Sequence, residues 1–144
     1  MASLNGIGLR GYQVLLANSL EMAAFTKKEI AKLDYCKVLN TDTTGSTVLW
    51  WVLPKGRNAE EIYAKLERGE LSLEEQGQYF HEIKHLFDKR SADLDPKIDA
   101  RLSFTTSIGY SPHGINIPAW KAVFFNPKTD RPVVEQVIRS IENL

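Results

Sequence analysis

The spacing of apolar residues changes along the chain from helical to strand-like and back again. After Tyr12 the apolar side chains recur three or four residues apart, at Leu15, Leu16, Leu20 and Ala23. This spacing predicts an amphipathic helix over residues 12–33. Residues 36–39 and 47–53 are rich in Val, Leu and Trp and flank a polar turn at 40–46, so they predict two strands joined as a hairpin.

Two capped helices are expected next. Asn58 with Glu61, and Ser72 with Glu75, each have the spacing of a capping box, in which side chains satisfy free backbone N–H groups. Gly69 ends the first of these helices, and residues 93–96 form a break after the second. The second helix carries one apolar face, made by Tyr79, Phe80, Ile83, Leu86 and Phe87.

The last third of the chain predicts a second pair of strands and a closing helix. Apolar side chains alternate with polar ones over residues 101–106. Over residues 120–125, Trp120, Ala122 and Phe124 alternate with Lys121, Val123 and Phe125, and a loop rich in Gly and Pro separates the two segments at 109–118. Thr129 or Asp130 caps the closing helix, which has Pro132 in its first turn. Its apolar stripe consists of Val134, Val137, Ile138 and Ile141. The order α, β, β, α, α, β, β, α predicts one α+β domain with a small, mostly antiparallel sheet packed with helices.

Composition excludes several classes of partner. The 18 basic and 18 acidic residues cancel, so no overall field favours nucleic acid or an anionic membrane. The longest apolar run, residues 48–53, is too short to cross a bilayer. A single cysteine, Cys36, rules out an internal disulfide and a cysteine-rich zinc site. With no targeting signal at the N-terminus, we expect a soluble, cytoplasmic domain.

Two stretches match well-known functional motifs. Gly6-Ile7-Gly8-Leu9-Arg10-Gly11 fits the G-x-G-x-x-G pattern of a phosphate-binding loop. Such a loop needs a strand feeding into it, so that a helix N-terminus faces the anion. Only five residues precede Gly6, so we interpret the run as flexible entry into the first helix and expect no cofactor site there.

His81-Glu82-Ile83-Lys84-His85 reads H-E-x-x-H on a predicted helix. His81 and His85 would lie one turn apart and share a Zn²⁺, with Glu82 as general base on a metal-bound water. A catalytic zinc also needs a third protein ligand, and none follows at a suitable spacing. Lys84 places a cation inside the motif. We therefore predict no metal site, and a zinc hydrolase stays as an alternative hypothesis.

Three further segments, taken in order, carry a family resemblance. They are residues 11–23, which begin Gly11-Tyr12, residues 46–54, and residues 120–127, which read WKAVFFNP. They resemble the helix that leaves the large domain, the "F-W-x-x-P" strand and the "R-x-V-x-x-N-P" strand of the group II pyridoxal-phosphate (PLP) decarboxylases, which act on glutamate, aspartate, cysteine sulfinate and aromatic amino acids. The similarity spans nearly the whole chain and is greatest to the branch with acidic substrates.

The resemblance implies that residues 1–144 are the C-terminal small domain of such an enzyme, a lyase of amino-acid and carboxylic-acid metabolism. Residues 1–33 would be the helix leaving the large domain, and residues 34–144 the α+β body. In the family, PLP is bound as a Schiff base by a lysine that follows a histidine. No His-Lys pair occurs here and the phosphate-binding loop is missing. We therefore expect no catalytic and no cofactor-binding residue in this chain, which alone would bind no PLP and be inactive.

The resemblance also implies partners and one substrate contact. The partner would be the large PLP-binding domain, met through an unusually apolar patch, in an enzyme that is typically homodimeric. Lys121 takes the place of the Arg that can contact a substrate carboxylate, although a solvated position on the sheet is the alternative. The loop with His113 and Asn116 would border the substrate. A non-catalytic interaction module remains the second alternative hypothesis.

Overall fold

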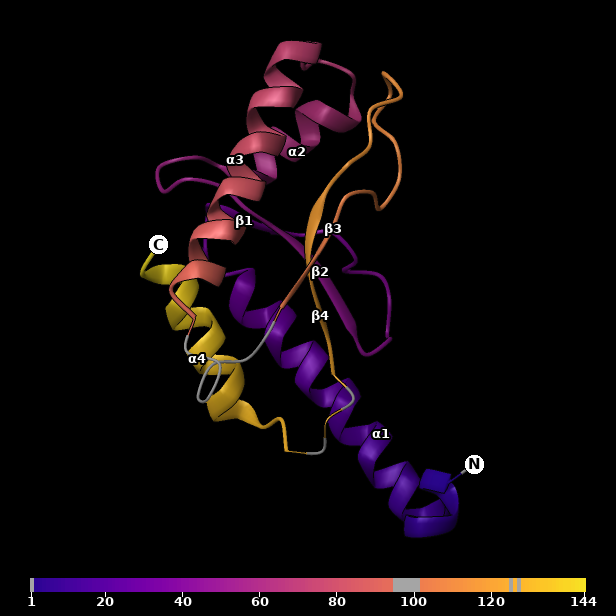
Figure 1. The fold of residues 1–144 in the computed structure, drawn as a ribbon. Helices are drawn as coiled ribbons and strands as arrows, with labels where there is room; N and C mark the ends of the chain where they lie inside the picture. The colour runs from indigo at the N-terminus through magenta and orange to yellow at the C-terminus, as the bar shows by residue number, and fades with distance from the viewer. Residues whose placement is uncertain (1, 95–101, 125, 127) are drawn as a thin grey trace.

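The computed structural model describes residues 2–94, 102–124, 126 and 128–144. Helices and strands follow the predicted order along the chain (Figure 1). They are α1 (Ala2–Ile30), β1 (Cys36–Val38), β2 (Thr47–Val52), α2 (Ala59–Glu67), α3 (Leu73–Ala92), β3 (Ser103–Thr105), β4 (Ala119–Val123) and α4 (Arg131–Glu142). The predicted α+β class is confirmed. Arg101, Phe125 and the second half of the predicted break at 93–96 lie outside the described residues.

The four strands form one sheet in the order β1-β2-β4-β3, and every neighbouring pair is antiparallel. Both predicted hairpins, β1-β2 and β3-β4, are present. The two hairpins are joined by pairing of β2 with β4, in which Trp50 lies opposite Trp120 and Leu49 lies opposite Lys121. Local sequence patterns gave no indication of this central pairing.

Side-chain caps fix where three of the helices begin. Ser72 and Glu75 form the complete capping box that their spacing predicts at the start of α3. Asn58 accepts from the backbone N–H of Glu61 at α2. At α4 the cap is Asp130, which accepts from the N–H of Val133 at 3.2 Å, so of the two predicted candidates Asp130 holds this position.

The first helix differs most from its prediction. It begins at Ala2 rather than Tyr12 and ends at Ile30 rather than Leu33. Gly8 adopts a non-helical conformation (φ 70°, ψ 170°) and kinks the helix. Because glycine is typical of helix ends, the sequence pattern did not predict the helical residues that precede this kink. After Ile30 the chain tightens into a turn in which the N–H of Leu33 donates to the carbonyl of Ile30 at 3.0 Å. The predicted strands are likewise slightly shorter than the patterns suggested.

The core lies on one face of the sheet, where Trp50 and Trp120 are fully buried and their rings lie 6.0 Å apart. Helix α4 packs all four residues of its predicted stripe into this core. Phe87 of α3 meets Trp120 edge-on at 5.3 Å. Helices α1 and α4 pack against each other, as Figure 1 shows. Strand alternation turns Lys121 to the opposite face, which has lighter cover.

Candidate functional site

Lys121 lies at the centre of β4, with Leu49 of β2 on one side and Ser103 of β3 on the other. All three side chains belong to the face of the sheet opposite Trp120, because successive strand residues point to opposite faces. Lys121 and Leu49 are half-buried and Ser103 is exposed. The structure thus places the predicted substrate residue on an accessible row of the sheet, as the alternation indicated.

The ammonium group of Lys121 has no carboxylate within ion-pair distance among the described residues. Lys37 makes an instructive comparison, since it lies on the same face in β1 and is paired with Glu60 at 2.8 Å. Its neighbour Trp51 is buried there by Tyr63 of α2 and Phe80 of α3. The aromatic side chains that cover this face therefore gather at Trp51. Lys121 has no ion-pair partner in the part of the chain that the structure describes, and an incoming carboxylate can pair with it.

The β3-β4 loop places its polar side chains in contacts of their own. His113 meets the amide nitrogen of the buried Gln76 through Nδ1 at 3.0 Å. Asn116 accepts from the hydroxyl of Ser107 at 3.1 Å through Oδ1. The loop is thereby attached to the start of α3, and its contacts give no support for a shared site with Lys121.

The H-E-x-x-H residues lie on α3 as predicted, but their geometry does not form a metal centre. The rings of His81 and His85 are stacked with centroids 6.3 Å apart, and both residues are exposed. Glu82 pairs with Arg57 at 3.1 Å, so its carboxylate is engaged by a cation. The described residues hold no group of three potential metal ligands. The hydrolase alternative therefore gains no geometric support.

The structure gives no support for a phosphate-binding loop at the glycine run or for a reactive thiol at Cys36. The residues immediately before Gly6 are helical, so no strand feeds this run in the manner a phosphate loop requires. Cys36 is buried on β1, and burial raises the pKa of its thiol to about 12. A thiol with this pKa stays protonated at neutral pH, which makes it a poor nucleophile.

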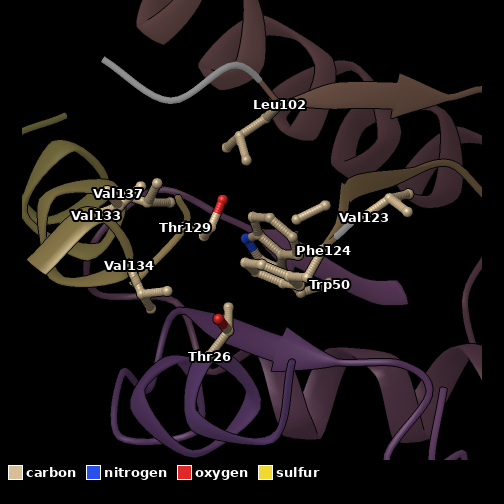
Figure 2. Close-up of a pocket in the computed structure, with 10 residues that line it drawn as sticks. Thr26, Trp50, Leu102, Val123, Phe124, Thr129, Val133, Val134 and Val137 are labelled. Carbon is tan, nitrogen blue, oxygen red and sulfur yellow. The ribbon is translucent and has the colours of Figure 1, made fainter. Parts of the chain in front are cut away.

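All three tryptophans lie in predicted strands and the sequence does not distinguish them, but the structure does. Trp51 donates its indole N–H to the carbonyl of Pro118 at 2.8 Å, and Trp120 donates to that of Ile83 at 3.1 Å. The indole N–H of Trp50 is buried without an acceptor in the described part of the chain. It borders a cavity between the sheet, α1 and α4 (Figure 2). The sequence carries no signal for which indole N–H finds an acceptor, because the acceptors are carbonyls distant along the chain.

Helix α1 carries large apolar side chains that no other element covers. Its N-terminal half extends past the end of the sheet in Figure 1. The exposed fraction reaches 65% at Leu9 and 66% at Val14. The same half-helix exposes Tyr12, Leu16 and Leu20. No helix in the described residues is both long and apolar enough to cross a membrane.

Comparison with known proteins gives matches of fold. No protein-family model and no curated protein sequence matches the chain. Solved structures do match, among them Catharanthus roseus tryptophan decarboxylase in complex with L-tryptophan (TM-score 0.61, 14% identity), Rhodiola rosea 4-hydroxyphenylacetaldehyde synthase (0.62, 15%) and mouse CSAD (0.63, 15%). Each of these matches covers 97% of this chain but only 24–25% of the other. The α+β fold expected from the resemblance is confirmed, and the chain has the fold of a quarter-length part of these proteins.

Proposed function

We propose that the chain is the C-terminal small domain of a PLP-dependent amino-acid decarboxylase, with residues 1–33 as the helix leaving the large domain and 34–144 as the body. Two independent lines support this proposal. The three sequence segments at 11–23, 46–54 and 120–127 resemble the group II decarboxylases. The fold matches about a quarter of a tryptophan decarboxylase over nearly all of this chain.

The cofactor belongs to the missing part of such an enzyme. When bound, PLP withdraws electrons from the carbanion that remains after CO₂ is lost. The chain offers no lysine next to a histidine to hold it. The cavity beside Trp50 measures about 70 Å³ and has no charged side chain in its wall, so it does not fit a phosphorylated ring. The chain would therefore contribute to binding and orienting the substrate rather than to holding the cofactor.

Lys121 is the residue proposed to do this, and its unpaired ammonium on an accessible sheet face is the observation that carries the proposal. Two unit charges 4 Å apart attract by about 4 kcal/mol near a protein surface. A side-chain carboxylate of aspartate or glutamate would be held by this attraction, whereas an aromatic side chain would not. Lys121 thus favours an acidic amino acid, with a point charge in place of the forked contact that Arg would give.

The exposed apolar half of α1 is the surface proposed to meet the large domain. Large apolar side chains that stay exposed in a row mark an interaction surface more often than a solvated one. Leu9, Val14 and Leu16 lie on this half-helix, close to where the large domain would join the chain. Burying them against a second domain would remove an apolar surface that is costly in water.

The test uses the full-length parent, assayed with aspartate, glutamate, cysteine sulfinate and aromatic amino acids. Lys121→Met is expected to raise KM for the acidic substrate by roughly 10- to 100-fold, as for loss of a charge-assisted contact. Lys121→Arg should retain most of the activity. Lys28→Met, which removes an exposed lysine of α1, is the matched control. An unchanged KM in Lys121→Met would contradict the substrate role.

A second measurement separates the domain assignment from the role of Lys121. The isolated chain should show no visible absorbance of bound PLP and no decarboxylation, while the parent shows both. A parent without decarboxylase activity on any of these substrates would favour the non-catalytic interaction module. Stoichiometric zinc in the purified chain, lost on replacing His81 and His85, would favour the hydrolase.

A further inference from the structure

A cavity of about 70 Å³ lies on the core side of the sheet, on the face opposite Lys121. Its wall comes from the sheet, α1, α4 and the residues that flank them, as the close-up in Figure 2 shows. The apolar part of the wall includes Leu102, Ala122, Phe124, Val133, Val134 and Val137. The cavity is thus formed by segments distant along the chain and is a feature of the complete fold.

One buried hydrogen-bond donor borders this cavity without a partner. Trp50 is fully buried, and its indole N–H meets no acceptor among the described residues. Its ring nitrogen points into the space enclosed by the labelled residues of Figure 2. Buried N–H groups almost always find an acceptor, as those of Trp51 and Trp120 do here. The unpartnered N–H therefore marks a position open to an acceptor that lies outside the described part of the chain.

The rest of the wall restricts the chemistry of that acceptor. Thr26 donates its hydroxyl to the carbonyl of Met22 at 2.7 Å, so this hydroxyl is not available as a donor. Thr129 supplies the other side-chain oxygen, and none of the ten lining residues is charged. A charged ligand would lose its hydration without a counter-charge to replace it. The cavity therefore favours a neutral, mainly apolar molecule.

We propose that this cavity is a binding site for a short neutral carbonyl compound, whose oxygen accepts from the Trp50 indole N–H and whose alkyl part packs on the α4 valines. The volume sets the size. A cavity of about 150 Å³ holds benzene, so 70 Å³ admits roughly three or four non-hydrogen atoms. Acetone, with a carbonyl between two methyl groups, is a probe of this size. The site is separate from Lys121, which lies on the other face of the sheet.

The test is an NMR titration of the ¹⁵N-labelled chain, in which the three indole N–H signals act as three local probes. Acetone is expected to shift the Trp50 signal in a saturable manner, and to leave those of Trp51 and Trp120 nearly unmoved because their N–H groups are already bonded. Acetate, which has the same shape but a charge, should not produce the saturable shift. Xenon, which fills apolar cavities without accepting a hydrogen bond, should compete with acetone.

Trp50→Phe supplies the second measurement. The variant should bind acetone roughly 2- to 10-fold more weakly, the range expected for one lost hydrogen bond, while xenon binding remains and shows that the cavity is intact. Three results would overturn the proposal. They are an acetone shift that is linear and equal at all three indoles, acetate binding as tight as that of acetone, and a contact from water to the Trp50 N–H that persists at the highest acetone concentration.

Discussion

The buried tryptophans Trp50 and Trp120 differ chiefly in whether their indole N–H groups are hydrogen-bonded, so replacing each by Phe isolates the effect of this bond. Trp50 and Trp120 lie opposite each other in neighbouring strands, and both are fully buried. Replacing either by Phe removes a similar amount of apolar ring. Only at Trp120 does the change also remove a hydrogen bond within the chain, the one to the carbonyl of Ile83 at 3.1 Å.

The difference between the two variants follows from the two kinds of N–H. Loss of the Trp120 bond should cost about 0.5–1.5 kcal/mol, in addition to the loss of packing. At Trp50 the substitution removes a buried N–H that lacks a protein acceptor, and so recovers a desolvation penalty of about 1–3 kcal/mol. Trp120→Phe is therefore expected to be less stable than Trp50→Phe by roughly 2–4 kcal/mol.

Equilibrium unfolding in urea measures this difference, since the linear extrapolation gives the free energy of unfolding of each variant. Trp51→Phe serves as a further comparison and should group with Trp120→Phe, because Trp51 donates to Pro118 at 2.8 Å. If the free energy of unfolding falls equally in all three variants, within about 0.5 kcal/mol, the assignment of Trp50 as the tryptophan with an unpartnered N–H is refuted.

Three further changes test local features of the fold. Asp130→Ala should lower the free energy of unfolding by about 1 kcal/mol because α4 loses its N-terminal cap, whereas Ala at the exposed Glu135 of the same helix should change little in urea titrations. Gly69→Ala should lower Tm, since Gly69 has φ 72°, while Gly77→Ala inside α3, with open space for a Cβ, should raise stability by up to about 1 kcal/mol. Burial raises the pKa of Cys36 from 9.0 to about 12, so its stabilising effect is complete below pH 9 and is lost as the pH rises toward 12. Stability of the wild type should therefore fall by up to about 1.4 kcal/mol per pH unit more steeply than that of Cys36→Ala in this window, and parallel curves would show that the thiol plays no part.

Features set by neighbouring residues were predictable from the sequence. The Ser72 and Glu75 capping box and the α4 stripe depend on residues three or four positions apart, and each hairpin pairs strands that follow each other directly along the chain. All of these features are present. The position of Lys121 on the accessible face followed from strand alternation for the same reason. The predicted start of α1 was wrong because glycines lower helix propensity, and yet here they lie inside the helix. One of them, Gly8, kinks it.

Features that depend on distant segments were not predictable. Pairing of β2 with β4 brings Trp50 against Trp120 across about half of the chain, and no local pattern specifies it. The three indoles have the same residue type, yet their hydrogen bonds depend on whether a carbonyl from α3 or the β3-β4 loop comes near. The cavity beside Trp50 is missed for this reason, since its wall combines α1, the sheet and α4.

The strand order has a consequence for how the chain folds. The two hairpins close over residues 39–46 and 106–118, stretches much shorter than the one between β2 and β4, and hairpins form in about 1–10 μs. Joining β2 to β4 instead requires the whole stretch containing α2, α3 and β3 to close as a loop, with an entropy cost that rises with loop length. We expect the two hairpins to form early and their association to limit the folding rate, so that substitutions at this central seam slow refolding more than substitutions in either turn.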